Sequence, residues 1–160
     1  KDRITLGIIS GIIGNIAKNL ASMGLSKVGL RDDNIHTKAA GIFMSRREAK
    51  TKAGKGLGIL TDFCIACKLG IILVYLLSAT GKDHPYLKGA SLGQSAWVIM
   101  YGVLSSLGGS KSHPVSPRTS FSNYLAHTVY GVATASAIMA LGDSNLFKPR
   151  YINLSNPTED

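Results

Sequence analysis

Four long stretches with almost no charged residues are the feature that most constrains this sequence. They lie at 4–25, 57–80, 87–107 and 121–141, and each contains 21 to 24 residues. An α-helix needs about 20 residues to cross the hydrocarbon core of a bilayer, because each residue advances it by about 1.5 Å. The sequence therefore predicts an all-α polytopic membrane protein with four transmembrane helices. We expect one membrane domain at 1–142 and a polar, frayed tail at 143–160.

The main alternative fold is a soluble helical bundle. Charged residues make up only 17% of the chain, against about 25% in an average globular protein, which favours the membrane interpretation. The first stretch is longer than the usual apolar core of a signal peptide, and no Ala-x-Ala-like cleavage site follows it, so we expect a retained helix. The two cysteines exclude a disulfide scaffold, and the apolar content of 45% excludes intrinsic disorder.

Small residues on one helix face predict how the bundle packs. At about 100° per residue, one face of the first stretch carries Gly7, Gly11, Gly14, Lys18 and Ser22. The Gly7-x-x-x-Gly11 spacing lets two membrane helices approach closely. The opposite side is rich in isoleucine and suits lipid. Close packing is also expected on the third stretch, which could self-associate through Gly89 and Gly93.

The polar connection at 26–56 carries eight Lys and Arg residues against three acidic residues. We expect it to contact anionic lipid headgroups, either as an amphipathic helix at 36–50 or as a solvated basic loop. The side of the membrane that holds the 26–56 and 108–120 loops has ten Lys and Arg residues, and the other side has six. The positive-inside rule therefore places both loops in the cytoplasm and both termini outside. Because Phe43 is its only aromatic residue and no reader motif is present, we expect no nucleic-acid binding.

Three ionisable side chains are expected at a similar depth inside the predicted spans. Lys18 lies seven residues before the end of the first span, Asp62 five residues after the start of the second, and His127 six residues after the start of the fourth. These three span ends are on the same side of the membrane, so all three residues lie roughly 8–10 Å inside one boundary. We expect a shared polar pocket with three further polar residues nearby: Asn15, Asn19 and Asn123.

Two interpretations of this pocket follow from its chemistry. It is either a proton or ion relay or anion-binding pocket, or a structural ion pair that fixes helix packing. His127 alone is equally compatible with a hydrogen-bonded packing residue. Lys68 lies near the middle of the second span and six residues from Asp62, on another helix face. It either pairs with Gln94 or marks an interface with another subunit.

No recognised catalytic or cofactor motif is present. The sequence lacks a phosphate-binding P-loop, a nucleophile elbow and a zinc-protease motif. Cys64 and Cys67 form C-x-x-C, but the apolar context and the lack of a second pair favour buried small residues over metal or redox chemistry. We therefore expect a protein that is not an enzyme and that has neither a metal nor another cofactor.

Several short motifs carry a resemblance to known proteins. They are the glycine-rich first helix with Lys18, A-A-G-I-F beside a basic run, A-G-K-G-L-G before the second span, and A-H-T-V-Y-G in the last span. In this order they resemble small bacterial integral-membrane proteins of the YqhR and YagU type, families of unknown function. The resemblance covers most of residues 4–141. It implies a four-helix protein of the bacterial inner membrane.

Together these features predict a structural or accessory subunit of a membrane assembly, with self-association as one form of that assembly. The alternative is a small transporter or channel that uses the pocket of Lys18, Asp62 and His127. A holin-like pore former is a third possibility that the long basic loop does not favour.

Overall fold

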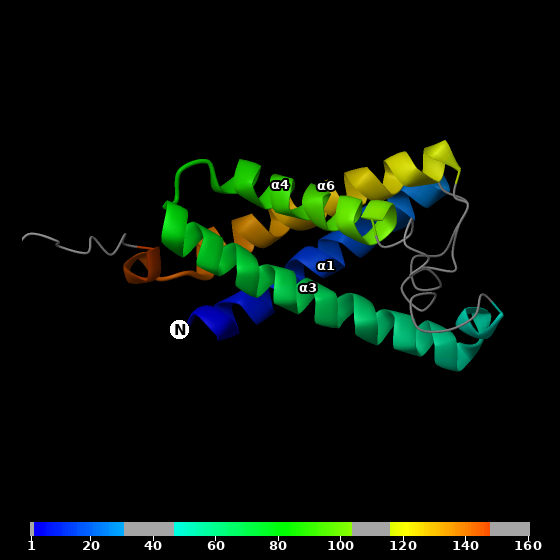
Figure 1. Ribbon diagram of the computed structural model, residues 1–160, viewed down its shortest axis with the longest axis horizontal. Helices are drawn as coiled ribbons and strands as arrows, with labels where there is room; N and C mark the ends of the chain where they lie inside the picture. The colour runs from blue at the N-terminus through cyan, green and yellow to red at the C-terminus, as the bar shows by residue number, and fades with distance from the viewer. Residues whose placement is uncertain (1, 31–46, 104–115, 148–160) are drawn as a thin grey trace, which may run out of the picture.

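The computed structural model describes residues 2–30, 47–103 and 116–147, and the regular structure in these ranges is helical. Its long helices are α1 (Arg3–Lys27), α3 (Lys52–Thr80), α4 (Pro85–Trp97) and α6 (Pro117–Leu141). The shorter segments are η1 (Glu48–Lys50), the π-helical η2 (Val98–Val103) and η3 (Ser144–Phe147). Figure 1 shows that successive long helices run in alternating directions along one axis.

Three of the described helices are long and apolar enough to cross a membrane. They are α1 with 25 residues, α3 with 29 and α6 with 25. The third predicted span, 87–107, has a different form. α4 contains only 13 residues, and the chain continues through the π-helical η2, while residues 104–107 lie outside the described part. A helical membrane protein is thus supported by three helices, and the structure does not establish a fourth crossing.

Capping residues explain why two helices begin several residues before the membrane spans predicted from the sequence. Thr51 accepts a hydrogen bond from Gly54 N at 3.1 Å, so α3 begins at Lys52 rather than at 57. Ser116 accepts one from Thr119 N at 3.3 Å, and Pro117 fits the first turn of α6, which therefore begins before 121. These side chains satisfy amide groups that have no partner within the first helical turn. Hydropathy alone does not show these polar starts.

Glycines set the packing of α1 against both of its neighbours. A Cβ at Gly7 would lie 2.5 Å from Ile71 Cα, and one at Gly11 would lie 2.4 Å from Ala66 O, both on α3. A Cβ at Gly14 would lie 2.0 Å from the Thr134 hydroxyl of α6. α1 is therefore held between α3 and α6 at distances that only glycine permits.

Two glycines of α4 also allow close packing, in this case against another helix of the same chain. A Cβ at Gly89 would lie 2.3 Å from Gly131 O, and one at Gly93 would lie 2.1 Å from His127 O. Gly89 and Gly93 therefore pack α4 against α6 of the same molecule. The expectation that these two glycines mediate self-association is wrong, because that helix face is already covered.

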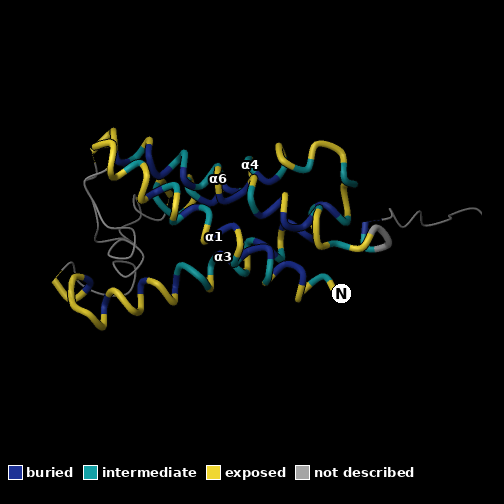
Figure 2. The backbone as a smooth tube through the Cα atoms, turned by 180° about the vertical axis from the view of Figure 1, so that it is seen from behind, coloured by how far each residue is buried: buried dark blue, intermediate teal, exposed yellow. Residues whose placement is uncertain are grey.

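The apolar core lies at the end of the bundle that holds the N-terminus. It is formed by Leu6, Leu73, Val74, Leu77, Ala135, Ile138 and Phe147. Phe147 is 4% exposed, and Arg3 Nη2 donates to Leu146 O at 2.9 Å. The tail is therefore packed through Phe147, which corrects the expectation of fraying from 143, while residues 148–160 lie outside the described part. Figure 2 shows burial concentrated where the helices meet, and an exposed start of α3.

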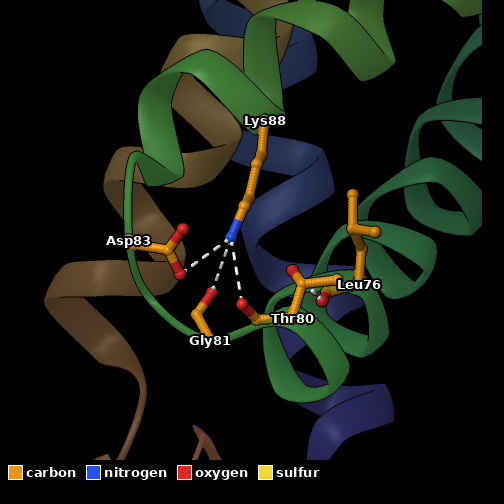
Figure 3. Close-up of polar contacts among 5 residues, drawn as sticks. All are labelled: Leu76, Thr80, Gly81, Asp83 and Lys88. Atoms are coloured by element: carbon orange, nitrogen blue, oxygen red, sulfur yellow. Dashed lines mark hydrogen bonds and ion pairs between the residues drawn. The ribbon is translucent and has the colours of Figure 1, made fainter.

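The turn between α3 and α4 is held by one lysine (Figure 3). Lys88 Nζ donates to Thr80 O at 3.2 Å, to Gly81 O at 3.1 Å and to Asp83 Oδ1 at 3.1 Å. The last carbonyls of a helix have no partner within the helix, so the ammonium group satisfies them at the negative end of the dipole of α3. The same contact lowers the pKa of the Asp83 carboxyl, chiefly through the hydrogen bond from Lys88.

Most of the basic 26–56 connection falls on residues 31–46, outside the described ranges. The predicted amphipathic helix at 36–50 is described only at its end, where Glu48–Lys50 form a 3-10 turn with Ala49 buried. Gly54 lies against this turn, since a Cβ there would lie 2.2 Å from Glu48 O.

Candidate functional site

One buried face of α1 is polar rather than apolar. Asn15 is fully buried, Lys18 is 6% exposed and Ser22 is 3% exposed. These residues follow one another at spacings of three and four, so they share a helix face. This face continues the glycine face that packs on α3 and α6. Buried polar side chains thus lie at the centre of the bundle. They lie in the half that contains the C-terminal end of α1 and the N-terminal end of α6.

Lys18 and Asp62 form an ion pair between α1 and α3. Lys18 Nζ donates to Asp62 Oδ1, and the two side chains are 7% and 13% exposed. Lys18 lies nine residues before the end of α1, and Asp62 lies ten residues after the start of α3. The antiparallel arrangement therefore brings them to one level, as the depth argument from the sequence predicts. The opposite charges offset part of each other's desolvation penalty.

Several buried polar atoms around this pair have no hydrogen-bond partner in the described structure. Both side-chain amide atoms of Asn15 and the second carboxylate oxygen of Asp62 are among them. The same holds for Asn19 Oδ1 and Ser22 Oγ, within about one turn of Lys18, and for Ser10 Oγ, which lies eight residues before Lys18 on α1. Together they present mainly acceptors, with the Asn15 amide and the serine hydroxyls as donors. Buried polar groups are normally hydrogen-bonded, so these atoms offer contacts to a small polar species.

Tyr130 is a further polar residue of this region that is not among the candidates predicted from the sequence. Tyr130 is 2% exposed, and its hydroxyl donates a hydrogen bond to Ala66 O at 2.7 Å. This hydrogen bond links α6 to α3. Ala66 lies one turn after Asp62 on α3. The four-residue spacing of Ala126, Tyr130 and Thr134, all buried, is the signal in the sequence that this face of α6 points inward.

His127 and Asn123 contribute to the interface of α6 with α4 and η2. His127 Nδ1 lies 2.8 Å from Asn123 O, and its ring meets the Tyr101 ring edge-on at 5.8 Å between centroids. Asn123 is buried at 3% exposure. The structure thus brings Lys18, Asp62 and Asn15 to one region, whereas these contacts of His127 lie towards α4. The contacts with Asn123 O and Tyr101 therefore place His127 at the interface of α6 with η2.

Lys68 occupies the side of α3 opposite to its packed face. Ala66 and Gly70 face α1, and Lys68 is exposed together with Cys64 and Tyr75. No described residue forms a hydrogen bond or ion pair with Lys68. Gln94, the partner suggested by the sequence, donates instead to Thr128 Oγ1 at 3.2 Å. The pairing of Lys68 with Gln94 is therefore not formed.

The two cysteines are free thiols on α3. Cys64 is exposed and Cys67 is partly buried, so the expectation of two buried small residues is wrong for Cys64. Within the described ranges no group of three or more His, Cys, Asp or Glu side chains is arranged to hold a metal ion.

A separate groove of about 730 Å³ lies between α1 and α6. Its walls are mainly apolar and include Ile13, Val132, Ala133 and Ala137. It differs from the polar face of α1 in its chemistry and lies on the surface of the bundle.

Comparisons of the chain with protein-family models, with curated proteins and with solved structures give no match. The geometry of the two lysine environments, one inside the bundle and one on its surface, is therefore the basis for any functional proposal.

Proposed function

We propose that the protein is a structural or accessory subunit of a larger membrane assembly. The observation that carries this proposal is the position of Lys68, a charged residue exposed in the middle of a membrane-capable helix. Ionisable residues inside membrane spans almost always face protein or water rather than lipid. A lysine on the outer side of an isolated bundle therefore indicates that another membrane component covers it.

Lys68 lies well inside the apolar span wherever α3 is placed in the bilayer. A span of about 20 residues that leaves out Lys52 and Lys55 lies between Gly56 and Thr80. In every such placement Lys68 is at least seven residues, or roughly 10 Å, from either edge. A lysine stem does not cover that distance, so the ammonium group cannot reach the headgroups without local distortion of the bilayer. Insertion scales give a cost of about 2.5–3.5 kcal/mol for such a position.

The interior of the bundle supports a scaffold role. The glycine contacts of α1 with α3 and of α4 with α6 leave no space for even one added carbon atom. The Lys18–Asp62 pair joins α1 to α3, and Tyr130 joins α6 to α3. Such contacts favour one fixed arrangement of the helices, because shifting any helix separates a buried polar pair or opens a void.

The proposed setting is a bacterial inner membrane, which the resemblance to YqhR- and YagU-type proteins supports. In this setting α4 and η2 complete the third of four crossings, and the count of Lys and Arg places both termini outside the cytoplasm. The cytoplasmic 26–56 connection then meets anionic lipid headgroups through its basic residues. Nucleic acid is not a proposed partner, and no enzymatic activity is proposed.

The test is the mass of the protein extracted directly from its source membrane into nanodiscs. We expect particles that contain the 16.9 kDa chain together with further protein, whether a different chain or another copy. Particles with one copy of this chain and lipid alone, both in nanodiscs and in mild detergent, would contradict the proposal.

A second candidate function is a small transporter or channel, and a specific observation favours it. Asn15 is fully buried beside Lys18, and neither its amide nitrogen nor its amide oxygen has a described partner. Ionisable residues inside a membrane span often mark ion or proton pathways, and the amide group of Asn15 offers a further polar contact beside the ion pair. Proteoliposomes that hold the purified chain would show proton or anion flux, and Asp62→Asn would abolish it. Flux equal to that of empty liposomes would remove this candidate.

A further inference from the structure

We infer that the outer face of α3 around Lys68 docks a transmembrane helix of a different protein, and that this helix carries a membrane-embedded carboxylate. The inference rests on the proposed function and names the chemistry of the partner. It is carried by the placement of a positive charge inside an otherwise uncharged helix face.

The docking face is the row of exposed residues along the middle of α3: Leu57, Leu60, Cys64, Lys68, Ile72 and Tyr75. Leu60 is 60% exposed, and Ile72 and Tyr75 are each 50% exposed. These positions recur at spacings of three and four residues, so they form one continuous stripe. The stripe lies opposite Ala66 and Gly70, which pack on α1. A straight helix of a partner therefore meets apolar side chains along its length and one ammonium group at its centre.

The partner group is best matched by a carboxylate. In hydrocarbon, a neutral acceptor such as a serine hydroxyl satisfies one N–H group but leaves the charge in place. An Asp or Glu side chain removes the net charge and also accepts hydrogen bonds. Lys18 provides an internal precedent, since the buried ammonium group of this same protein is paired with the carboxylate of Asp62.

A second copy of this chain does not supply that carboxylate. Asp62 is the only acidic residue in α1, α3 and α6, and it is bound to Lys18 inside the bundle. Two copies that meet through this face would bring two Lys68 side chains together. Like charges in a low-dielectric setting repel strongly, so the occupant is a different protein.

A lipid phosphate is also a poorer match. Phosphate groups lie at the level of the headgroups, whereas Lys68 is roughly 10 Å or more inside either edge of the apolar span. The partner helix can place its carboxylate at the depth of Lys68 without moving charge through hydrocarbon.

The experiment uses the full chain and a designed probe helix in vesicles of zwitterionic lipid. The probe is a transmembrane Leu/Ala helix with one central Glu, and its control has Gln at that position. The protein carries Cys64→Ser and Cys67→Ala, with a donor dye on Ser91→Cys, which lies on the exposed surface of α4 away from the docking face. Energy transfer to an acceptor on the probe measures the association.

We expect the Glu probe to associate roughly ten-fold more tightly than the Gln probe. Lys68→Met should reduce its association to the level of the Gln probe, while Lys68→Arg should retain it. Lys55→Met is the matched control, because this exposed lysine of the same helix lies outside the apolar span, and it should change nothing. Equal association of the Glu and Gln probes, or unchanged association after Lys68→Met, would overturn the inference.

Different results would contradict this inference and the proposed function. If the native particle contains other proteins but Lys68→Met leaves it intact, the assembly exists and this docking face is wrong. If the native particle contains one chain and lipid alone, the proposed function is wrong whatever the probe does. If adding anionic lipid abolishes the preference for the Glu probe in both wild type and Lys68→Arg, lipid occupies the site and the protein partner is wrong.

Discussion

The two faces of α3 differ in whether their charged side chain has a partner of opposite charge. On the inner face, Asp62 is paired with Lys18, and the side chains are 13% and 7% exposed. On the outer face, Lys68 is exposed among apolar residues, and no described residue pairs with it. The two positions are six residues apart on one helix. The difference shows that the described part of the chain neutralises one of its two deeply placed lysines, Lys18, and supplies no partner for the other, Lys68.

The contrast also separates two roles of charge in a membrane protein. The Lys18–Asp62 pair fixes the level of α1 against α3, because sliding either helix would separate the charges. Lys68 contributes nothing comparable to the described fold. The largest effects on stability are therefore expected on the inner face, and the largest effects on assembly are expected on the outer face.

The strongest expected effect on stability comes from breaking the inner pair. Asp62→Asn removes the negative charge and strands the Lys18 ammonium group inside the bundle, at a cost of about 3–5 kcal/mol. Thermal unfolding of the purified protein in mild detergent measures this loss.

The combined variant Lys18→Met with Asp62→Leu sharpens this test. It leaves no buried charge and should recover much of the lost stability. If Asp62→Asn leaves the unfolding temperature unchanged, the two residues do not form the pair described above. A double variant that is stable and still assembles supports the structural role, while one that is stable but has lost ion flux supports the transporter candidate.

The glycines of α3 offer a second comparison of the two faces. A Cβ at Gly70 would lie 2.2 Å from Gly7 O and 2.9 Å from Gly11 Cα, whereas a Cβ at Gly56 would meet nothing within 4 Å. Gly70→Ala should cost about 1–3 kcal/mol, because two backbones must move apart. Gly56→Ala should stabilise by about 0.5–1 kcal/mol through better helix propensity. Denaturation of both variants in the same detergent checks the signs, and equal effects would contradict the inner packing.

The end of α3 is expected to contribute less than its inner face. Lys88→Met removes the hydrogen bonds to Thr80 O and Gly81 O and should cost about 0.5–1 kcal/mol. Because the pKa of Asp83 is lowered, its contribution is fully present above the ordinary value of 3.8 and is lost as the pH falls through the lowered pKa. Unfolding of wild type against Lys88→Met should show a difference that shrinks at acid pH. A constant difference would exclude the contact with Asp83.

The smallest effect on stability is expected at Lys68. No described residue pairs with Lys68, so in mild detergent Lys68→Met should change the free energy of unfolding by no more than about 0.5 kcal/mol. The same substitution at Lys18 should be clearly destabilising, since it leaves Asp62 without its partner. A large loss for Lys68→Met would place a contact within the chain at this position and would weaken the case for an external partner.

The sequence predicted those features of the fold that depend on the length of a helix and on the depth of a residue within it. Helix length and apolar content indicated α1, α3 and α6, and counting residues from the span ends brought Lys18 to the level of Asp62. It did not reveal the direction in which α3 turns its side chains, because both faces of this helix are apolar and both carry one charge. The outward position of Lys68 follows only from where Ala66 and Gly70 pack.

Other differences have local physical causes. The α-helix changes to a π-helix at Val98, which is neither Gly nor Pro, and η2 contains a single glycine, Gly102. The hydropathy at 87–107 therefore indicates one continuous span. The role of Gly89 and Gly93 depends on which helix lies next to α4, which spacing along one helix cannot show. Tyr130 could not be selected from the sequence, because an aromatic residue on a face of small residues indicates only apolar packing. Its hydrogen bond to Ala66 O depends on the position of α3, which the sequence does not give.

The role of Lys68 in assembly is tested most directly by comparing native particles of two variants extracted from the source membrane. We expect Lys68→Met to release the chain as a single copy with lipid. We expect Lys18→Met with Asp62→Leu, which removes both charges from the inner face, to retain the companion protein. If Lys68→Met keeps the same particle mass as wild type, the outer face of α3 is not where this protein meets its partner.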